Sequence, residues 1–278
     1  MIEKESSDAE ALSEEFLDEY FLDADLTPER LAQLTLDEKR ELYQFSERID
    51  IDENEVEVFL LQCGFPQEIL DGMKLGVKFT IYESLKEYGS NAEFFGHDDI
   101  EIPFPTSNTQ NAIASNDGEN HPNGTISDSY LTLSVSSVFV NGNNLNRYLL
   151  YPSFEWTGVT NLNYDTFAYA LHANYWKLLR TGELDIYWSG SLLRTLDPTR
   201  MDFTAKVYKM RENDLSLPYY GVASIAARPL ISTMHNQIML GYAQDFYNNL
   251  GVNIGAFSIS FSGGTNTKYA RLTFDKGY

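Results

Sequence analysis

Two carboxylates separated by one residue stand in residues 183–188 (ELDIYW), a stretch typical of a β-strand. Alternate side chains of a strand face the same side, so Glu183, Asp185 and Tyr187 are expected on one face. β-Sandwich glycosidases use such carboxylate pairs as acid and nucleophile or base, and Glu155 is the obvious third carboxylate from another strand. The alternative is an ordinary solvent-facing strand, because alternation alone places acids on one side. The three acids are therefore weak catalytic candidates.

Aromatic side chains are the second group of candidates. The chain has 18 Tyr, 17 Phe and 3 Trp. Exposed Tyr and Trp offer a large contact area with a polar tip, which suits sugar stacking or protein contacts. The alternative is core packing and cross-strand pairing. The predicted ligand-binding residues are Tyr175, Trp176, Tyr187, Tyr219 and Tyr220.

Other chemistries find little support. Residues 50–61 begin like a calcium loop, but Glu55 stands where glycine is needed and Leu61 where the last acidic ligand is needed. Cys63 lies in an apolar helical run, which favours a buried, inert thiol. Phosphate-binding and nucleophile-elbow motifs are absent, and no zinc spacing joins the four histidines, His97, His121, His172 and His235. The sequence therefore predicts no metal and no cofactor, and it favours a non-enzymatic protein while leaving enzymatic activity open.

The elements that position these residues change in type along the chain. Residues 1–26 are an acidic leader, expected to be partly disordered. Residues 27–90 predict a small helical module, with the capping box TLDE at residues 35–38 and helix breaks at Gly64 and Pro66. Residues 91–127 predict a linker or long loop, since Asn, Ser, Thr, Gly and Pro dominate its second half.

After Ile126 the apolar period changes to two. In residues 130–140 the side chains of Leu131, Leu133 and Val135 share one face, and Asn141-Gly142 predicts a hairpin turn. Similar runs give about nine strands over residues 128–278. The expected fold is α+β overall, with the helical module followed by an antiparallel all-β sandwich or barrel.

Charge separates the two halves of the chain. The net charge is −21, yet residues 1–125 hold 30 Asp and Glu against 8 Lys and Arg, whereas residues 126–278 hold 11 against 12. An acidic segment repels phosphate, which argues against a nucleic-acid partner. The β domain is close to neutral, so the overall charge does not describe its ligand.

Residues 147–156 (RYLLYPSFEW) resemble a strand of secreted Gram-positive bacterial proteins of unknown function, with the pattern RYLxYPSF-W. Residues 240–245 with 252–264 are similar to the last strands of those proteins, and residues 63–73 to a preceding helix pair. The resemblance implies export to the cell surface or medium, and it supplies no active site. No signal peptide opens the given sequence, so it is presumed removed; a cytoplasmic location is the alternative.

These features favour an exported, non-enzymatic surface or binding protein that recognises a protein or a carbohydrate through its β domain. One alternative is a secreted, membrane-active β toxin, because Ser and Thr alternate with apolar residues in 130–140 and 252–262. A β-sandwich carbohydrate-active enzyme is the other. A membrane partner is expected only for the toxin, and the oligomeric state stays open.

Overall fold

The computed structural model describes residues 47–48, 52–86, 88–104, 129–141, 147–156, 164–179, 182–188, 191–201, 204–211, 219–231, 235–245, 251–262 and 266–275. Its helices are α4 (Glu53–Gln62), α5 (Gln67–Gly72), α6 (Leu75–Leu85) and the 3-10 turn η1 (Gly89–Asn91). Its strands are β1 (Glu47–Arg48), β2 (Ala92–Phe104), β3 (Ser129–Val140), β4 (Arg147–Trp156), β5 (Tyr164–Leu171), β6 (Trp176–Leu178), β7 (Leu184–Trp188), β8 (Ser191–Leu196), β9 (Arg200–Met201), β10 (Ala205–Arg211), β11 (Tyr220–Ala223), β12 (Ile225–Pro229), β13 (Gln237–Asp245), β14 (Gly251–Gly255), β15 (Ser258–Ser262) and β16 (Asn266–Thr273).

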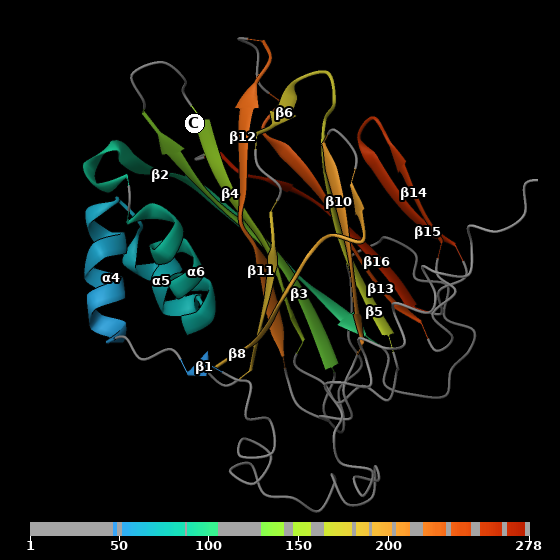
Figure 1. Cartoon of the computed structure of the whole chain (residues 1–278), viewed down its shortest axis with the longest axis horizontal. Coiled ribbons are helices and arrows are strands. Elements are labelled where there is room, and N and C mark those ends of the chain that lie inside the picture. The colour runs from blue at the N-terminus through green and yellow to red at the C-terminus, as the bar shows by residue number, and fades with distance from the viewer. Residues whose placement is uncertain are drawn as a thin grey trace, which may run out of the picture. The chain divides into compact units, whose positions relative to one another are not determined.

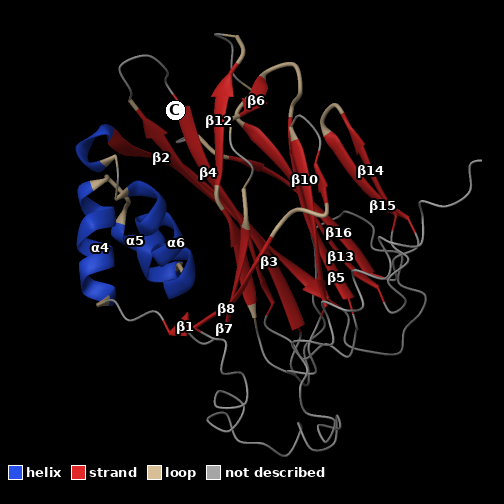
Figure 2. Ribbon diagram, in the orientation of Figure 1, coloured by secondary structure: helices blue, strands red, loops and turns tan. Residues whose placement is uncertain are grey.

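The strands form two large antiparallel sheets and a hairpin (Figures 1 and 2). The first sheet has the order β1-β8-β7-β11-β4-β12-β6, and β3 joins β2 to β4. The order in the second sheet is β16-β13-β5-β10-β9, and β14 pairs with β15. The described strands make a sandwich and not a closed barrel, so the predicted α+β class with an antiparallel sandwich is confirmed.

Residues 128–278 hold 14 described strands, against about nine expected. The run at 252–261 was expected to be one strand, but it turns back at Ala256 and Phe257 and forms the β14–β15 hairpin. The run at 219–227 is divided at Ser224 into β11 and β12, which pair with different parts of β4. Short strands such as β6 and β9 carry too few residues to show a period of their own.

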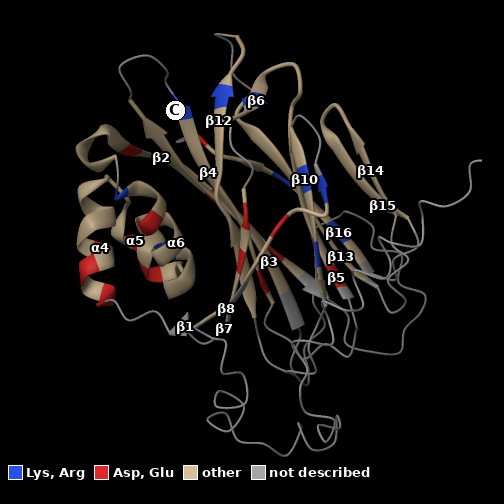
Figure 3. Ribbon diagram, in the orientation of Figure 1, with Lys and Arg blue, Asp and Glu red and all other residues tan. Residues whose placement is uncertain are grey.

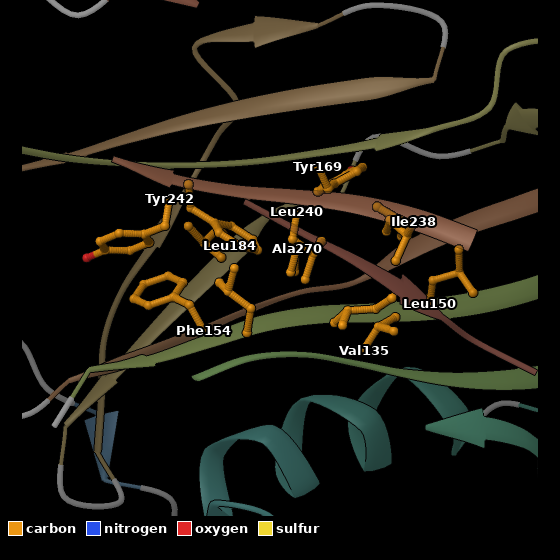
Figure 4. Close-up of a cluster of buried hydrophobic side chains, with 14 of the residues drawn as sticks. Val135, Leu150, Phe154, Tyr169, Leu184, Ile238, Leu240, Tyr242 and Ala270 are labelled. Atoms are coloured by element: carbon orange, nitrogen blue, oxygen red, sulfur yellow. The ribbon is translucent and has the colours of Figure 1, made fainter. Parts of the chain in front are cut away.

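The main core lies between the two sheets. Alternate residues of β3, β4, β5 and β13 point into it, so the two-residue period is the direct cause of this core. Figure 4 shows Val135, Leu150 and Phe154 of the first sheet facing Leu240 and Tyr242 of the second. The outer side of the second sheet is covered in part by the hairpin, through Val252 and Ile259.

The helices cover the outer side of the first sheet (Figure 2). Val56, Leu60 and Ile81 are fully buried and share one hydrophobic cluster with strand residues Tyr151 and Val222. Residues 53–85 are thus helical, as predicted for that part of the module at 27–90, and they share a hydrophobic core with the first sheet. Helices of this size bury too little apolar surface on their own, and the sheet supplies the missing partner.

Part of the predicted linker is wrong. Residues 92–104 form β2, which pairs with β3 along its length, with a register shift between Phe94 and Gly96. The sequence prediction misses this strand because acidic side chains such as Asp99 and Glu101 give it the polar composition of a loop. Charged side chains of this kind are usual on exposed edge strands. The acidic leader at 1–26 and the rest of the linker at 105–127 lie outside the described residues.

Gly76 allows α6 to approach the sheet closely. A Cβ atom at Gly76 would lie 2.5 Å from Cγ of the Tyr187 ring, and the Gly76 N–H donates to the Tyr220 hydroxyl at 3.1 Å. We expect Gly76→Ala to lower the free energy of unfolding by about 1–3 kcal/mol, because the added methyl group overpacks this contact. Urea unfolding measures the effect.

Gly72→Ala is the matched control, since no atom lies within 4 Å of a Cβ at that position. This variant should unfold close to the wild-type midpoint. Equal stability of the two alanine variants would contradict the close approach of α6.

Candidate functional site

The predicted catalytic face of β7 lies under a helix. Asp185 pairs with Val222 in the sheet register, and Tyr187 pairs with Tyr220, which in turn pairs with Glu155. Antiparallel partners point to the same side, so Asp185 and Glu155 do share a face, as expected. That face is the one covered by α6, which fills the space that a sugar ring would need.

Asp185 is held by hydroxyl groups. The Thr195 hydroxyl donates to its Oδ1 at 2.7 Å, and the Thr80 hydroxyl of α6 donates to its Oδ2 at 3.2 Å. Burial raises the pKa of Asp185, and the two threonine hydrogen bonds offset part of that rise. Thr80 also lies 2.7 Å from the Tyr187 hydroxyl, so Asp185 helps to seat α6 on the sheet.

The other two candidate acids have different surroundings. The Lys74 ammonium pairs with Glu155 at 2.9 Å, and Glu183 is exposed just before β7 begins. Helix α6 begins at the residue after Lys74, so this ion pair also joins the helices to the sheet. Among the described residues, the structure does not bring the three weak catalytic candidates together around an open space.

Three of the five predicted ligand-binding aromatics are buried. Trp176 and Tyr187 are each 1% exposed, and Tyr220 is 7% exposed. Trp176 packs between the sheets, whereas Tyr187 and Tyr220 stack on each other beneath α6, with ring centroids 5.5 Å apart. In the conformation described, Trp176 is enclosed by the main core, and the helices cover Tyr187 and Tyr220; the predicted contact of these residues with a ligand stays a prediction. Tyr175 and Tyr219 remain partly exposed.

Tyr219 belongs to a polar cluster that the sequence did not indicate. Asp165 is fully buried at one end of the core, and its Oδ2 accepts hydrogen bonds from the hydroxyls of Tyr219 and Tyr242. Those two hydroxyls lie 2.8 Å apart. A buried carboxylate needs such donors to offset the loss of water, so this cluster stabilises the sandwich rather than presenting a reactive group.

A serine, a histidine and an aspartate also meet on the first sheet. The Ser136 hydroxyl lies 2.8 Å from His97 Nδ1, and Asp99 Oδ1 lies 3.9 Å from His97 Nε2. Burial lowers the pKa of His97, and Asp99 and Asp98 offset part of that change. The carboxylate is too distant for a hydrogen bond, and Ser136 is only 2% exposed. The group lacks an accessible nucleophile, and it secures the pairing of β2 with β3.

Tyr175 lies in a different setting, a cluster of rings that we call the end cluster: His172, Tyr175, His235 and Phe257. The His172 ring centroid lies 4.5 Å from that of Tyr175 and 5.4 Å from that of Phe257. The His235 ring stacks on Tyr175 with centroids 5.5 Å apart. All four side chains are partly exposed. The end cluster is therefore a formed, accessible aromatic surface.

Backbone contacts of three segments fix the end cluster. His172 follows β5 and its carbonyl accepts the N–H groups of Tyr175 and Trp176, both at 3.0 Å. The buried Trp176 indole donates to the His235 carbonyl at 2.8 Å. The hairpin turn that carries Phe257 is bound through the Ala173 N–H, which donates to Ala256 at 2.9 Å. These hydrogen bonds thus hold the segments that carry the end cluster in place on the sandwich.

Sequence patterns alone could not find His172, His235 and Phe257. The proximity of the two histidines follows from the pairing of β5 with β13, in which Leu171 opposes Ile238. Residues just beyond those positions in each strand must meet at the same end of the sheet, which places His172 near His235. Phe257 joins them only because residues 251–262 fold back as a hairpin.

Exposed aliphatic side chains flank the end cluster. Leu230 and Ile231, which follow β12, are 48% and 46% exposed. The Leu230 N–H donates to the Tyr175 carbonyl at 2.7 Å, so the two segments are in direct contact. Apolar side chains gathered beside partly exposed rings are typical of protein contact surfaces.

Metal-binding and thiol chemistry find no support in the described part of the chain. It contains no group of three or more His, Cys, Asp or Glu side chains placed to hold a metal ion. Cys63 is buried and burial raises the pKa of its thiol, which makes it a poor nucleophile. None of the described helices has the length and apolar character needed to span a bilayer.

Comparisons with known proteins give no family. No family model and no curated protein matches the chain. Among solved structures it is similar to the collagen-binding subdomain of the Enterococcus faecalis surface protein ACE, with 8% identity and a TM-score of 0.27 over 47% of this chain and 88% of that one. It is similar to the collagen-binding domain of the Erysipelothrix rhusiopathiae surface protein RspB, with 5% identity and a TM-score of 0.25 over 54% of this chain and 67% of that one. Likeness at this level supports no argument about function.

The raised pKa of Asp185 predicts a pH effect on stability. When the folded-state pKa of an acid exceeds its unfolded value, the folded state holds the proton more tightly between the two values. The contribution of Asp185 to stability therefore falls as pH rises above the ordinary aspartate range. We expect the wild-type protein to gain stability relative to Asp185→Asn as pH falls from 7 towards 4, measured by urea unfolding across that range.

Asp197→Asn is the control, because Asp197 is exposed after β8. A stability difference between wild type and Asp185→Asn that stays constant with pH would show that Asp185 is not titrating in a buried setting.

Proposed function

We propose that the chain is an exported, non-enzymatic binding protein that recognises a protein ligand through the end cluster. The observation that carries the proposal is the position of four partly exposed rings beside the exposed side chains of Leu230 and Ile231. Rigid rings anchored from below lose little conformational entropy on binding, which makes them effective contact residues.

A protein ligand fits this surface better than a carbohydrate. Sugar rings stack on open aromatic faces, but the stacking of Tyr175 on His235 already uses one face of each ring. The aliphatic flank offers apolar area without hydroxyl partners for a sugar, and it suits the apolar side chains of a protein. The carbohydrate-active enzyme is disfavoured further because Asp185 and Glu155 lie beneath or beside α6.

The membrane-active toxin receives no specific support either. Its main sequence argument was the Ser and Thr alternation of residues 130–140. In the structure, β3 pairs on both sides, and Leu131, Leu133 and Val135 fill the main core. The apolar face that a toxin would turn to lipid is already occupied by the second sheet.

The export part of the proposal is supported by the sequence resemblance to secreted Gram-positive proteins. It is tested by expressing the complete gene with a C-terminal tag in a Gram-positive host. Tagged protein in the medium or wall fraction is expected, and confinement to the cytoplasm would contradict export.

The binding part is tested by selecting ligands from a phage-displayed library of random peptides on the folded wild-type protein. We expect Tyr175→Ala and Phe257→Ala each to weaken the selected peptides by about tenfold or more, because truncating a central aromatic contact costs about 1.4 kcal/mol or more. Tyr82→Ala is the control, since Tyr82 is a partly exposed tyrosine of α6 that packs edge-on against Phe59 in the helical layer. Biolayer interferometry gives the affinities.

Equal affinity for wild type and both cluster variants would show that the end cluster is not the binding surface. Thermal unfolding of each variant separates lost binding from lost folding. A glycan array run beside the peptide selection tests the carbohydrate alternative; glycan binding that depends on Tyr175 would replace the protein ligand.

A further inference from the structure

We propose that the ligand of the end cluster is an acidic protein segment that also carries apolar side chains. This inference rests on the proposed function, and it adds the chemical class of the partner. It follows from how the basic residues of the described chain are paired, which differs between the helical layer and the end of the sandwich.

The lysines of the helical layer all have acidic partners. Lys74 pairs with Glu155, Lys78 with Glu53 and Glu57, and Lys86 with Glu83. This layer therefore presents no unpaired lysine for a ligand.

The basic residues around the end cluster are different. Lys177, Arg228 and Arg271 form no ion pair with any carboxylate in the part of the chain described. The Arg228 Nε atom is enclosed and makes no hydrogen bond to a described residue. Lys177 and Arg271 are exposed and Arg228 is half-buried. These three cations thus have no carboxylate partner among the residues that the structure describes.

These cations border the rings and the aliphatic flank. Lys177 and Arg228 oppose each other across β6 and β12, one register step from Trp176 and Pro229. Leu230 directly follows β12, and its N–H donates to the Tyr175 carbonyl. Figure 3 shows the Lys and Arg positions of β6 and β12 at the same end of the sheet.

Arg271 approaches the end cluster from the second sheet. Its guanidinium carbon lies 5.0 Å from the centroid of the Phe257 ring, a cation–π contact that keeps the charge at the rim. Within the described part of the chain, the end cluster therefore has a cation without a carboxylate partner on the side of each sheet, with aromatic rings between them.

An acidic segment with apolar side chains matches both parts of this surface. Its apolar side chains would contact Leu230, Ile231 and the rings, and its carboxylates would lie near Lys177 and Arg228. Charges at the rim of an interface mainly steer association and select the partner, whereas the apolar centre supplies most of the affinity. A basic or neutral segment would leave the three cations unpaired.

The experiment uses peptides selected on the wild-type protein and sorted by their dependence on Tyr175. We expect the Tyr175-dependent peptides to be enriched in Asp and Glu beside aromatic or aliphatic residues. Lys177→Glu and Arg228→Glu should each weaken these peptides about three- to tenfold, and added salt should weaken the wild-type complex. Lys209→Glu is the control, because Lys209 is a partly exposed lysine on the outer side of the second sheet.

Two results would overturn the inference while leaving the proposed function in place. The first is a set of Tyr175-dependent peptides that are neutral or basic and insensitive to charge reversal at Lys177. The second is binding to vesicles that contain phosphatidylserine, abolished by Lys177→Glu, without any preference for acidic peptides; it would assign the cations to a membrane surface. Loss of Tyr175 dependence in all selected peptides would instead overturn the proposed function itself.

Discussion

The close contact of helix α6 with the first sheet determines which surfaces of the molecule remain available. Gly76 has no side chain, so the helix backbone can lie against the Tyr187 ring. Around this contact, Thr80 joins Asp185 and Tyr187 by hydrogen bonds, and the Ser84 hydroxyl lies 2.5 Å from that of Tyr151. Hydrogen bonds require particular partners and directions, whereas apolar burial does not. These polar contacts therefore set the position of the helical layer on the strands.

That layer explains which parts of the molecule the sequence could predict. The two-residue period of β3 and β4 identifies the sandwich core, because core-facing side chains must alternate. The same period says nothing about what covers the other side. Asp185, Tyr187 and Tyr220 alternate towards an outer face and were therefore interpreted as solvent-facing, but they lie beneath α6. Strand β2 was missed for a related reason, since its acidic edge resembles a polar loop.

The end cluster could not be predicted because it is built from contacts between distant segments. His172 and Tyr175 come from the β5–β6 turn, His235 from the start of β13, and Phe257 from a hairpin turn. Tyr175 was named from the sequence for its type alone. Its neighbour Trp176 has the same type and the opposite role, since it anchors the cluster from the core through the His235 carbonyl. Residue type indicates the chemistry available, and only the fold decides which side chain faces outward.

The arrangement of layers leaves the ends of the sandwich as the natural position for a binding surface. Helices cover much of the outer side of the first sheet, the two sheets cover each other, and the β14–β15 hairpin covers part of the second. Side chains at the strand ends are not subject to these constraints, yet the strands still hold them rigidly. Recognition residues are commonly placed on turns of this kind, supported by a stable scaffold. At the other end, Asp165 accepts hydrogen bonds from Tyr219 and Tyr242 within the fold. The end that carries Tyr175 has partly exposed rings, and its cations Lys177, Arg228 and Arg271 have no carboxylate partner among the described residues, which is why the proposed binding surface is placed there.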